Sequence, residues 1–238
     1  MELPTKKTTA SVVNPKKLII YSKPKTGKTA LVAALDNNLI LDLENSADYY
    51  DSMHIKITNV NELKEVIKNI IEAGKPYTYI TLDTLTKLED LCMPYAVELY
   101  KKTAMGKAFN GTDVLTLPNG AGYKYLRDAI TNLLNALYMC ADTIILLGHL
   151  KTTVLEVQGK EVSARELDLT GKIKSMISAD VDAIGLLYRA ENNKNIISFK
   201  TTDDVICGAR PEHLKNQEIV ISEMVDGKLV TNWDKIYK

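Results

Sequence analysis

The feature that most constrains this chain is a phosphate-binding loop set between an expected strand and an expected helix. Residues 22–29 read SKPKTGKT and follow the apolar run at residues 18–21. They match the pattern G-x-x-x-x-G-K-[ST] except at the first position, where Ser22 replaces glycine. Such loops wrap phosphate groups with backbone N–H groups at the start of a helix. The octapeptide therefore predicts a strand, a loop and a helix that bind a nucleotide.

Each residue type in the loop has a chemical reason. Lys28 is expected to reach the β- and γ-phosphates, and Thr29 to place its hydroxyl on Mg²⁺. The predicted cofactors are ATP and Mg²⁺, with GTP not distinguished. The alternative is a lysine-rich surface loop that happens to contain Gly-Lys-Thr. The predicted nucleotide-binding residues are Lys23, Pro24, Lys25, Thr26, Gly27, Lys28, Thr29 and Ala30.

A magnesium site also needs an acid at the tip of a neighbouring apolar strand, and Asp83 supplies it after residues 79–82. The metal ligands are therefore predicted to be Thr29 and Asp83. Alternatively, Asp83 only caps the helix that begins near Thr84.

Hydrolysis requires a group that orients or deprotonates the attacking water. Many AAA-type ATPases carry a glutamate directly after the strand-tip aspartate, but Thr84 occupies that position here. Glu44 is the preferred candidate, reaching the γ-phosphate from an adjacent strand; the alternative makes Asp42 the important acid and Glu44 a solvated turn residue. His149 follows the apolar run 143–148 and is expected to sense the γ-phosphate, unless it is only structural.

Short apolar runs alternate with amphipathic segments, which predicts an α/β fold with a largely parallel sheet. Helices are expected near residues 28–35, 60–71, 84–105 and 125–138, with a kink or break at Pro94 in the third. Residues 106–122 read as a long irregular loop. Two hairpins are expected, one joined by residues 158–160 and one by residues 191–195.

Composition limits the functional classes. The chain has 238 residues with 30 basic and 30 acidic side chains, so net charge gives no case for nucleic acid and any such binding must be local. No apolar run approaches the roughly 20 residues that span a bilayer, which predicts a soluble, cytoplasmic protein. The widely spaced Cys92, Cys140 and Cys207 are expected to be reduced thiols. Only four arginines occur: Arg127, Arg165, Arg189 and Arg210.

Together these residues resemble the RecA-like P-loop ATPases, specifically the compact phage-type ATPases associated with single-strand annealing and recombination. The resemblance covers roughly residues 15–210. It rests on the loop at 22–29, on Glu44, on the run ending at Asp83, on Leu147-Gly148-His149, and on the later stretches 168–174 and 181–189. It implies a RecA-like core at 15–210 with antiparallel hairpins toward the C-terminus, a flexible segment at 1–14 and a packed extension at 211–238.

The resemblance also implies partners. A nucleotide would lie between subunits of a ring or filament, and a basic residue would complete the site in trans, with Arg210 and Lys200 preferred and Arg189 next. Single-stranded DNA would contact loops at 106–122 and 151–172 in phage recombination or replication, in the host cytoplasm. Candidate contacts are Lys102, Lys107, Lys124, Lys151, Lys160 and Lys172, with Phe109 or Tyr123 for stacking.

Two rival functions remain open at this stage. A P-loop kinase would need an arginine-rich lid, which four scattered arginines do not favour. A nucleotide-gated binding module with little hydrolysis would use the same loop to switch partners.

Overall fold

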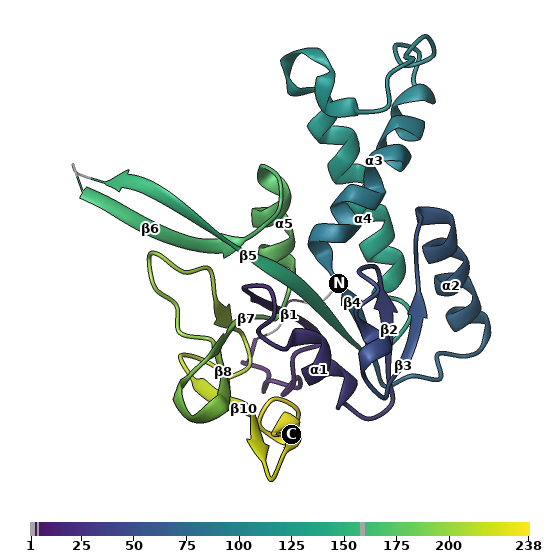
Figure 1. Ribbon diagram of the computed structural model, residues 1–238. Coiled ribbons are helices and arrows are strands. Elements are labelled where there is room, and N and C mark those ends of the chain that lie inside the picture. Colours follow the sequence, from purple (N-terminus) through teal and green to yellow (C-terminus); the bar gives the residue numbers. More distant parts are fainter. Residues whose placement is uncertain (1–2, 4, 158–159) are drawn as a thin grey trace.

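The computed structural model describes residue 3, residues 5–157 and residues 160–238. In these residues an eleven-stranded sheet carries helices on both faces (Figure 1). The strands are β1 Lys17–Ser22, β2 Asn38–Asp42, β3 Met53–Lys56, β4 Tyr79–Asp83, β5 Thr143–Val157, β6 Lys160–Leu167, β7 Ala183–Arg189, β8 Lys194–Ser198, β9 Gly208–Ala209, β10 Glu218–Val225 and β11 Lys228–Thr231. The α-helices are α1 Lys28–Ala33, α2 Val60–Glu72, α3 Leu85–Lys101, α4 Gly122–Leu137 and α5 Lys172–Asp180.

The sheet has a parallel part and an antiparallel part. Its order is β11-β10-β8-β7-β1-β5-β4-β2-β3, with β6 paired to β5 and β9 to β7. The strands from β7 to β3 in that order are parallel to their neighbours, whereas β8, β10 and β11 run antiparallel. The predicted α/β class, with antiparallel additions toward the C-terminus, is confirmed. The parallel register brings the carboxyl ends of β1, β2, β4 and β7 to one edge of the sheet.

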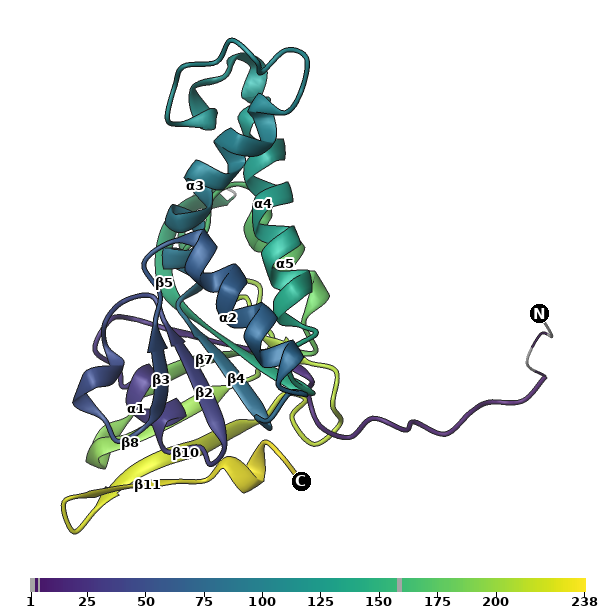
Figure 2. The ribbon, with the colours of Figure 1, turned by 90° about the vertical axis from the view of Figure 1, so that its right-hand side faces the viewer.

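Both faces of the sheet are buried because successive strand residues point to opposite sides. In β1, Ile19 and Tyr21 face the layer that contains α2, α3, α4 and α5. Leu18 and Ile20 face the layer that contains α1 and the C-terminal residues. Figure 2 shows the first four-helix layer rising above the sheet, with α3 and α4 projecting as a long antiparallel pair.

Two elements differ from the sequence expectation. The strand predicted to end at His149 continues unbroken to Val157, since its outer half pairs with β6 from Leu150↔Leu167 to Val157↔Lys160. This ribbon leaves the body of the molecule (Figure 1), so residues 151–167 are not a loop. The expected break at Pro94 is absent, because α3 is one continuous helix from Leu85 to Lys101. Gln158 and Gly159, at the predicted turn, lie outside the described residues.

The start of α2 and the segment between α3 and α4 have defined local structure. Asn59 caps α2 by accepting hydrogen bonds from the N–H groups of Asn61 and Glu62, both at 3.0 Å. Residues 106–121 are irregular apart from the short 3₁₀ turns Val114–Thr116 and Pro118–Gly120. The β7–β8 hairpin forms where it was expected. Residues 5–16, which precede β1, form neither helix nor strand and extend away from the core (Figure 2).

The C-terminal residues complete the layer beneath α1. Trp233 is only 7% exposed, and its indole N–H donates to the carbonyl of Leu31 in α1 at 3.0 Å. Its ring stacks on Tyr237 with centroids 5.9 Å apart. Because β10 and β11 extend the same sheet, residues 218–236 help to bury the face on which α1 lies.

We expect Trp233→Ala to lower the free energy of unfolding by about 3–5 kcal/mol, because it removes a large buried ring and leaves a cavity against α1. Chemical denaturation measures this change. Val230→Ala in β11 is the matched control, since Val230 is 42% exposed and should change stability by less than about 1 kcal/mol. Equal effects of the two variants would contradict a core role for Trp233.

Candidate functional site

The predicted site residues gather at the carboxyl edge of the parallel strands. Ser22 ends β1, and its register partner on β5 is His149. Asp42 ends β2 and is the register partner of Asp83, which ends β4. The sequence expectation that Glu44 lies on a strand adjacent to β1 is wrong, because β5 and β4 separate β1 from β2. Glu44 instead reaches the site along the edge of the sheet.

The phosphate-binding loop is held in shape by its own groups. The carbonyl of Lys23 accepts hydrogen bonds from the hydroxyls of Ser22 and Thr26, both at 2.8 Å. Gly27 precedes α1 with φ 103°, a conformation that side chains beyond glycine rarely adopt. The loop therefore turns directly into the N-terminus of α1, where free N–H groups and the helix dipole favour an anion.

Lys28 is a buried cation. The residue is only 6% exposed, and its Nζ donates a hydrogen bond to Ser22 Oγ at 3.1 Å. Among the described residues no carboxylate lies within ion-pair distance of Nζ. Burial lowers the pKa of Lys28, opposed by the nearby charges of Asp83 and Glu44. An ammonium group removed from water without a contacting counter-charge fits a bound phosphate.

Three oxygen atoms meet beside Lys28. Thr29 Oγ1 donates to Asp83 Oδ2 at 2.7 Å, and Ser46 Oγ donates to the same oxygen at 3.1 Å. Burial raises the pKa of Asp83, while the hydrogen bonds from Thr29 and Ser46 oppose that rise. Hydroxyl and carboxylate oxygens are the donors that Mg²⁺ prefers, so the set fits this metal when nucleotide phosphates supply further ligands. In the described part of the chain, no group of three or more His, Cys, Asp and Glu side chains is arranged to hold a metal alone.

Glu44 lies half-buried at the same edge. Its Oε1 accepts from Thr84 Oγ1 at 2.7 Å and lies 2.8 Å from His149 Nε2. The hydrogen bond to His149 is the main reason that the pKa of Glu44 is lowered, with Thr84 adding to the effect against burial. Glu44 is therefore a positioned carboxylate that stays ionised at neutral pH. His149 Nδ1 is buried and has no hydrogen-bond partner among the described residues.

Asp42 has a different task. It is fully buried, and its carboxylate accepts the backbone N–H groups of Glu44, Ser46 and Ala47 at 3.0, 3.2 and 2.9 Å. These bonds shape the turn that carries Glu44 and Ser46. Of the two acids weighed from the sequence, Asp42 holds the turn and Glu44 faces the site.

A cavity of about 290 Å³ joins these groups. Besides the predicted residues it is lined by Asn45, Ser46, Tyr49 and Tyr50, which sequence reasoning missed. Tyr49 is 86% exposed and Tyr50 is 40% exposed, both in the 3₁₀ turn after β2 or next to it. Two adjacent tyrosines five and six residues after a predicted catalytic acid were a usable signal. Thr84 was seen only as the residue that replaces a glutamate, not as the group that positions Glu44.

The basic residues expected to act in trans lie elsewhere in the subunit. Arg210 pairs with Asp182 at 3.0 Å and donates to the carbonyl of Ala179 at 2.8 Å. Asp182 directly precedes β7, so this pair lies at the amino edge of the parallel strands, opposite the phosphate loop. Lys200 pairs with Glu218. Arg189 ends β7 at the same edge as the loop and is exposed.

The predicted DNA contacts fall into two groups. Lys102, Lys107, Lys124 and Tyr123 lie at the far end of the α3–α4 pair, and Lys151, Lys160 and Lys172 lie on the β5–β6 ribbon or at the start of α5. Lys151 lies 3.8 Å from Asp168. Phe109 is partly buried against Tyr100, with ring centroids 5.3 Å apart, so it belongs to the packing of that end.

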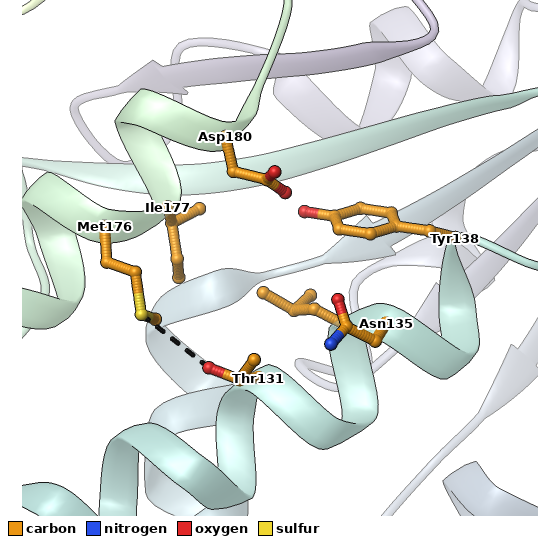
Figure 3. Close-up of a pocket in the computed structure, with 7 residues that line it drawn as sticks. Thr131, Asn135, Tyr138, Met176, Ile177 and Asp180 are labelled. Carbon is orange, nitrogen blue, oxygen red and sulfur yellow. Dashed lines mark hydrogen bonds between the residues drawn. The ribbon is translucent and has the colours of Figure 1, made fainter. Parts of the chain in front are cut away.

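A separate pocket of about 200 Å³ lies between α4 and α5 (Figure 3). Thr131 and Met176 meet across it, with Oγ1 and Sδ 3.7 Å apart. Asp180 at its edge is already paired with Lys17 at 2.8 Å. None of its lining residues belongs to the predicted site, so it is not the nucleotide cavity.

Comparison with known proteins adds the following. The profile of a family described as "AAA domain" matches residues 14–210. A solved structure, "Crystal structure of the RadB recombinase", is similar with a TM-score of 0.49 at 10% sequence identity, covering 91% of each chain. No curated protein sequence matches the chain. In the described residues none of the helices combines the length and hydrophobicity needed to cross a membrane.

The two acids of this edge should separate in their effect on stability. We expect Asp42→Ala to lower the free energy of unfolding by about 2–4 kcal/mol, because it strands the N–H groups of Glu44, Ser46 and Ala47. Glu44→Gln keeps the shape and should change it by less than about 1 kcal/mol. Urea denaturation of both variants measures the difference. Similar losses would show that Asp42 does not organise the turn.

Proposed function

Since the chain belongs to the AAA domain family, we propose that it is a magnesium-dependent ATPase that acts on single-stranded DNA. The observation that carries the proposal is the shared cavity at the sheet edge. Lys28, the Thr29–Asp83 pair and an ionised Glu44 all line it. A phosphate-binding cation, a set of metal ligands and a positioned base are the groups that hydrolysis of a nucleoside triphosphate requires.

The residues divide the work by position. Lys28 and the N–H groups of the loop bind the phosphates, and Thr29 and Asp83 hold Mg²⁺. When bound, Mg²⁺ neutralises charge that develops on the phosphate oxygens. Glu44 orients the attacking water and accepts its proton, while Thr84 and His149 fix the carboxylate.

His149 connects the nucleotide cavity to the rest of the molecule. It holds Glu44 through Nε2, and its backbone N–H donates to Thr86 Oγ1 at 3.4 Å. Thr86 in turn donates to the carbonyl of Asp168, just after the ribbon, at 3.1 Å. A nucleotide that displaces Glu44 therefore perturbs a hydrogen-bonded chain that ends at the base of the ribbon, which supports a role for His149 in reporting nucleotide state.

Tyr49 and Tyr50 suit the base of the nucleotide. Both line the cavity with the phosphate-binding groups, and both are exposed to solvent. Stacking of a base on such a ring contributes about 1–3 kcal/mol and tolerates any base.

The DNA part of the proposal rests on the resemblance to phage-type RecA-like ATPases, which implies a role in recombination or replication. Exposed lysines at the end of the α3–α4 pair, with Lys151 on the ribbon, support it. Self-association would bring a basic residue of a neighbouring copy to the cavity, with Arg210 and Lys200 available once their ion pairs open.

Two variants test the chemistry. We expect Lys28→Ala to weaken ATP binding and abolish turnover, because it removes the cation that faces the phosphates. Glu44→Gln should bind ATP with unchanged affinity but lower kcat at least about 100-fold, because an amide cannot accept the proton of water. Fluorescent-nucleotide binding and phosphate-release assays measure the two steps. Full turnover by Glu44→Gln would assign the base to another residue, whereas wild-type protein that binds ATP without turning it over would be a nucleotide-gated binding module.

The DNA part has its own test. We expect single-stranded DNA to raise the rate of ATP turnover by wild-type protein at low salt, with the effect weakening as salt rises. Steady-state turnover across a titration with oligo-dT measures this, and duplex DNA of the same length is the comparison. A flat titration at low salt would remove DNA from the proposal and leave the ATPase.

A further inference from the structure

A second cavity lies on the outer face of the phosphate-binding loop. Its volume is about 510 Å³, within the range of small-ligand sites. It lies between the loop, the point where β5 leaves the sheet, and the carboxyl end of β7. Its lining comprises Lys23, Pro24, Lys25, Thr26, Leu150, Thr152, Arg165, Leu186, Leu187, Tyr188 and Arg189.

The cavity is cationic in a way that the chain as a whole is not. Two of the four arginines, Arg165 and Arg189, line it together with Lys23 and Lys25. No acidic side chain is among its described lining residues. Arg165 forms an ion pair with Asp204, whose Oδ2 lies 3.5 Å from one terminal nitrogen of the guanidinium. A net charge of zero overall makes this concentration of four cations a local feature of the fold.

Both arginines are placed by backbone structure. The N–H of Arg165 donates to the carbonyl of Asp204 at 2.6 Å, and the carbonyl of Arg165 accepts from Ile206 at 3.1 Å. Arg189 pairs with Asn195 across the β7–β8 hairpin, which the Ala190–Lys194 hydrogen bond closes at 2.8 Å. The side chain of Arg165 is 47% exposed, so its guanidinium remains accessible to a ligand beside the ion pair with Asp204.

The rest of the lining mixes apolar and hydroxyl-bearing side chains. Pro24, Leu150 and Tyr188 are at least partly exposed, whereas Leu186 and Leu187 are buried on opposite faces of the sheet, and Thr26 and Thr152 add hydroxyl groups. The hydroxyl of Tyr188 donates to Glu218 at 3.0 Å. A cavity that combines guanidinium groups with an apolar and aromatic wall suits a ligand with a phosphate and a flat ring. A carboxylate from a neighbouring subunit would satisfy the cations but leave most of this volume and wall without a contact.

We propose that this cavity binds one nucleotide unit of a single strand, with Arg165 and Arg189 on its phosphodiester and the base against the apolar wall. The inference rests on the proposed DNA function. It assigns DNA binding to a site that the candidate lysines from the sequence did not reveal. The cavity lies at the base of the ribbon and is open to solvent, so the DNA on either side of the bound nucleotide would continue over the protein surface. Duplex DNA does not enter, because its bases are stacked and paired.

The arginines are cleaner probes than the lysines. Lys25 lines both this cavity and the ATP cavity, so a change at Lys25 would alter both ligands. Arg165 and Arg189 line only the second cavity. Arg127 in α4 lines neither cavity, so Arg127→Ala removes the same charge at an unrelated position and serves as the matched control.

The test measures binding of a fluorescein-labelled oligo-dT of about 20 nucleotides by anisotropy, with Mg²⁺ and a non-hydrolysable ATP analogue present. We expect Arg165→Ala and Arg189→Ala each to weaken binding about 3- to 10-fold, and the double variant about 10- to 100-fold. In the double variant the slope of log K against log salt should fall by about 0.7, since the two arginines neutralise one phosphate of the single strand. Arg127→Ala and wild type should agree, and affinity for the ATP analogue should stay within about twofold in all variants.

A second double variant guards against loss of folding. Arg165→Lys combined with Arg189→Lys keeps both positive charges but removes the guanidinium groups that form paired hydrogen bonds to phosphate. We expect it to keep the wild-type slope of log K against log salt while weakening oligo-dT binding about 3- to 10-fold. Thermal unfolding monitors each protein.

The outcomes separate the two levels of the claim. If the double alanine variant binds oligo-dT as tightly as wild type and keeps DNA-stimulated turnover, the proposal that this cavity binds DNA is overturned. The proposed function would then still stand. A second result would also overturn the proposal for this cavity. If the arginine variants bound free dTMP more weakly than wild type but bound oligo-dT equally well, the cavity would be a mononucleotide site. Failure of wild type to bind oligo-dT would overturn both.

Discussion

The buried ammonium of Lys28 is the interaction on which the rest of the site depends. Removing this charge from water is unfavourable unless an anion compensates, and among the residues that the structure describes Ser22 Oγ is the one hydrogen-bond partner of the ammonium group. The fold tolerates the arrangement because β1 is buried on both faces and fixes the loop from below, while the N-terminus of α1 directs its N–H groups into the same cavity. Affinity for phosphate is therefore built into the core packing and not added at the surface.

The geometry of the candidate site comes from four strands and not from a local motif. Asp83 ends β4, the turn that carries Glu44 follows β2, and His149 lies on β5 beside Ser22 of β1. Thr84 both caps α3 and donates to Glu44, so the residue after the strand-tip aspartate positions the carboxylate of Glu44. Parallel register makes this possible, because a shift of one residue in any strand would turn its terminal side chain to the opposite face.

The sequence was most informative where chemistry is local. The strand–loop–helix order around residues 22–29 and the strand that ends at Asp83 depend on a few neighbouring residues, and the structure has both. The sequence was least informative where distant segments meet. Nothing in residues 39–44 indicates that two strands intervene between β2 and β1. A hairpin joined by residues 158–160 was expected, but nothing in residues 143–157 indicates that its first strand is continuous with the central strand β5. The convergence of Arg165 and Arg189 depends on that same ribbon and so was equally invisible.

The continuity of β5 has a mechanical consequence. One strand begins in the centre of the sheet, passes His149 and ends at the far part of the ribbon, with a paired residue at nearly every step. At Gly148 the crossing is so close that an added Cβ would lie 2.2 Å from Leu167 Cδ1, so the two strands of the ribbon are clamped where they leave the sheet. Eight residues beyond His149 correspond to about 26 Å at roughly 3.3 Å per residue. A shift of a fraction of an ångström at His149, with the crossing of Gly148 and Leu167 as the pivot, therefore becomes a displacement of several ångströms at the tip of the ribbon. Strand β5 thus acts as a lever whose short end lies in the nucleotide site.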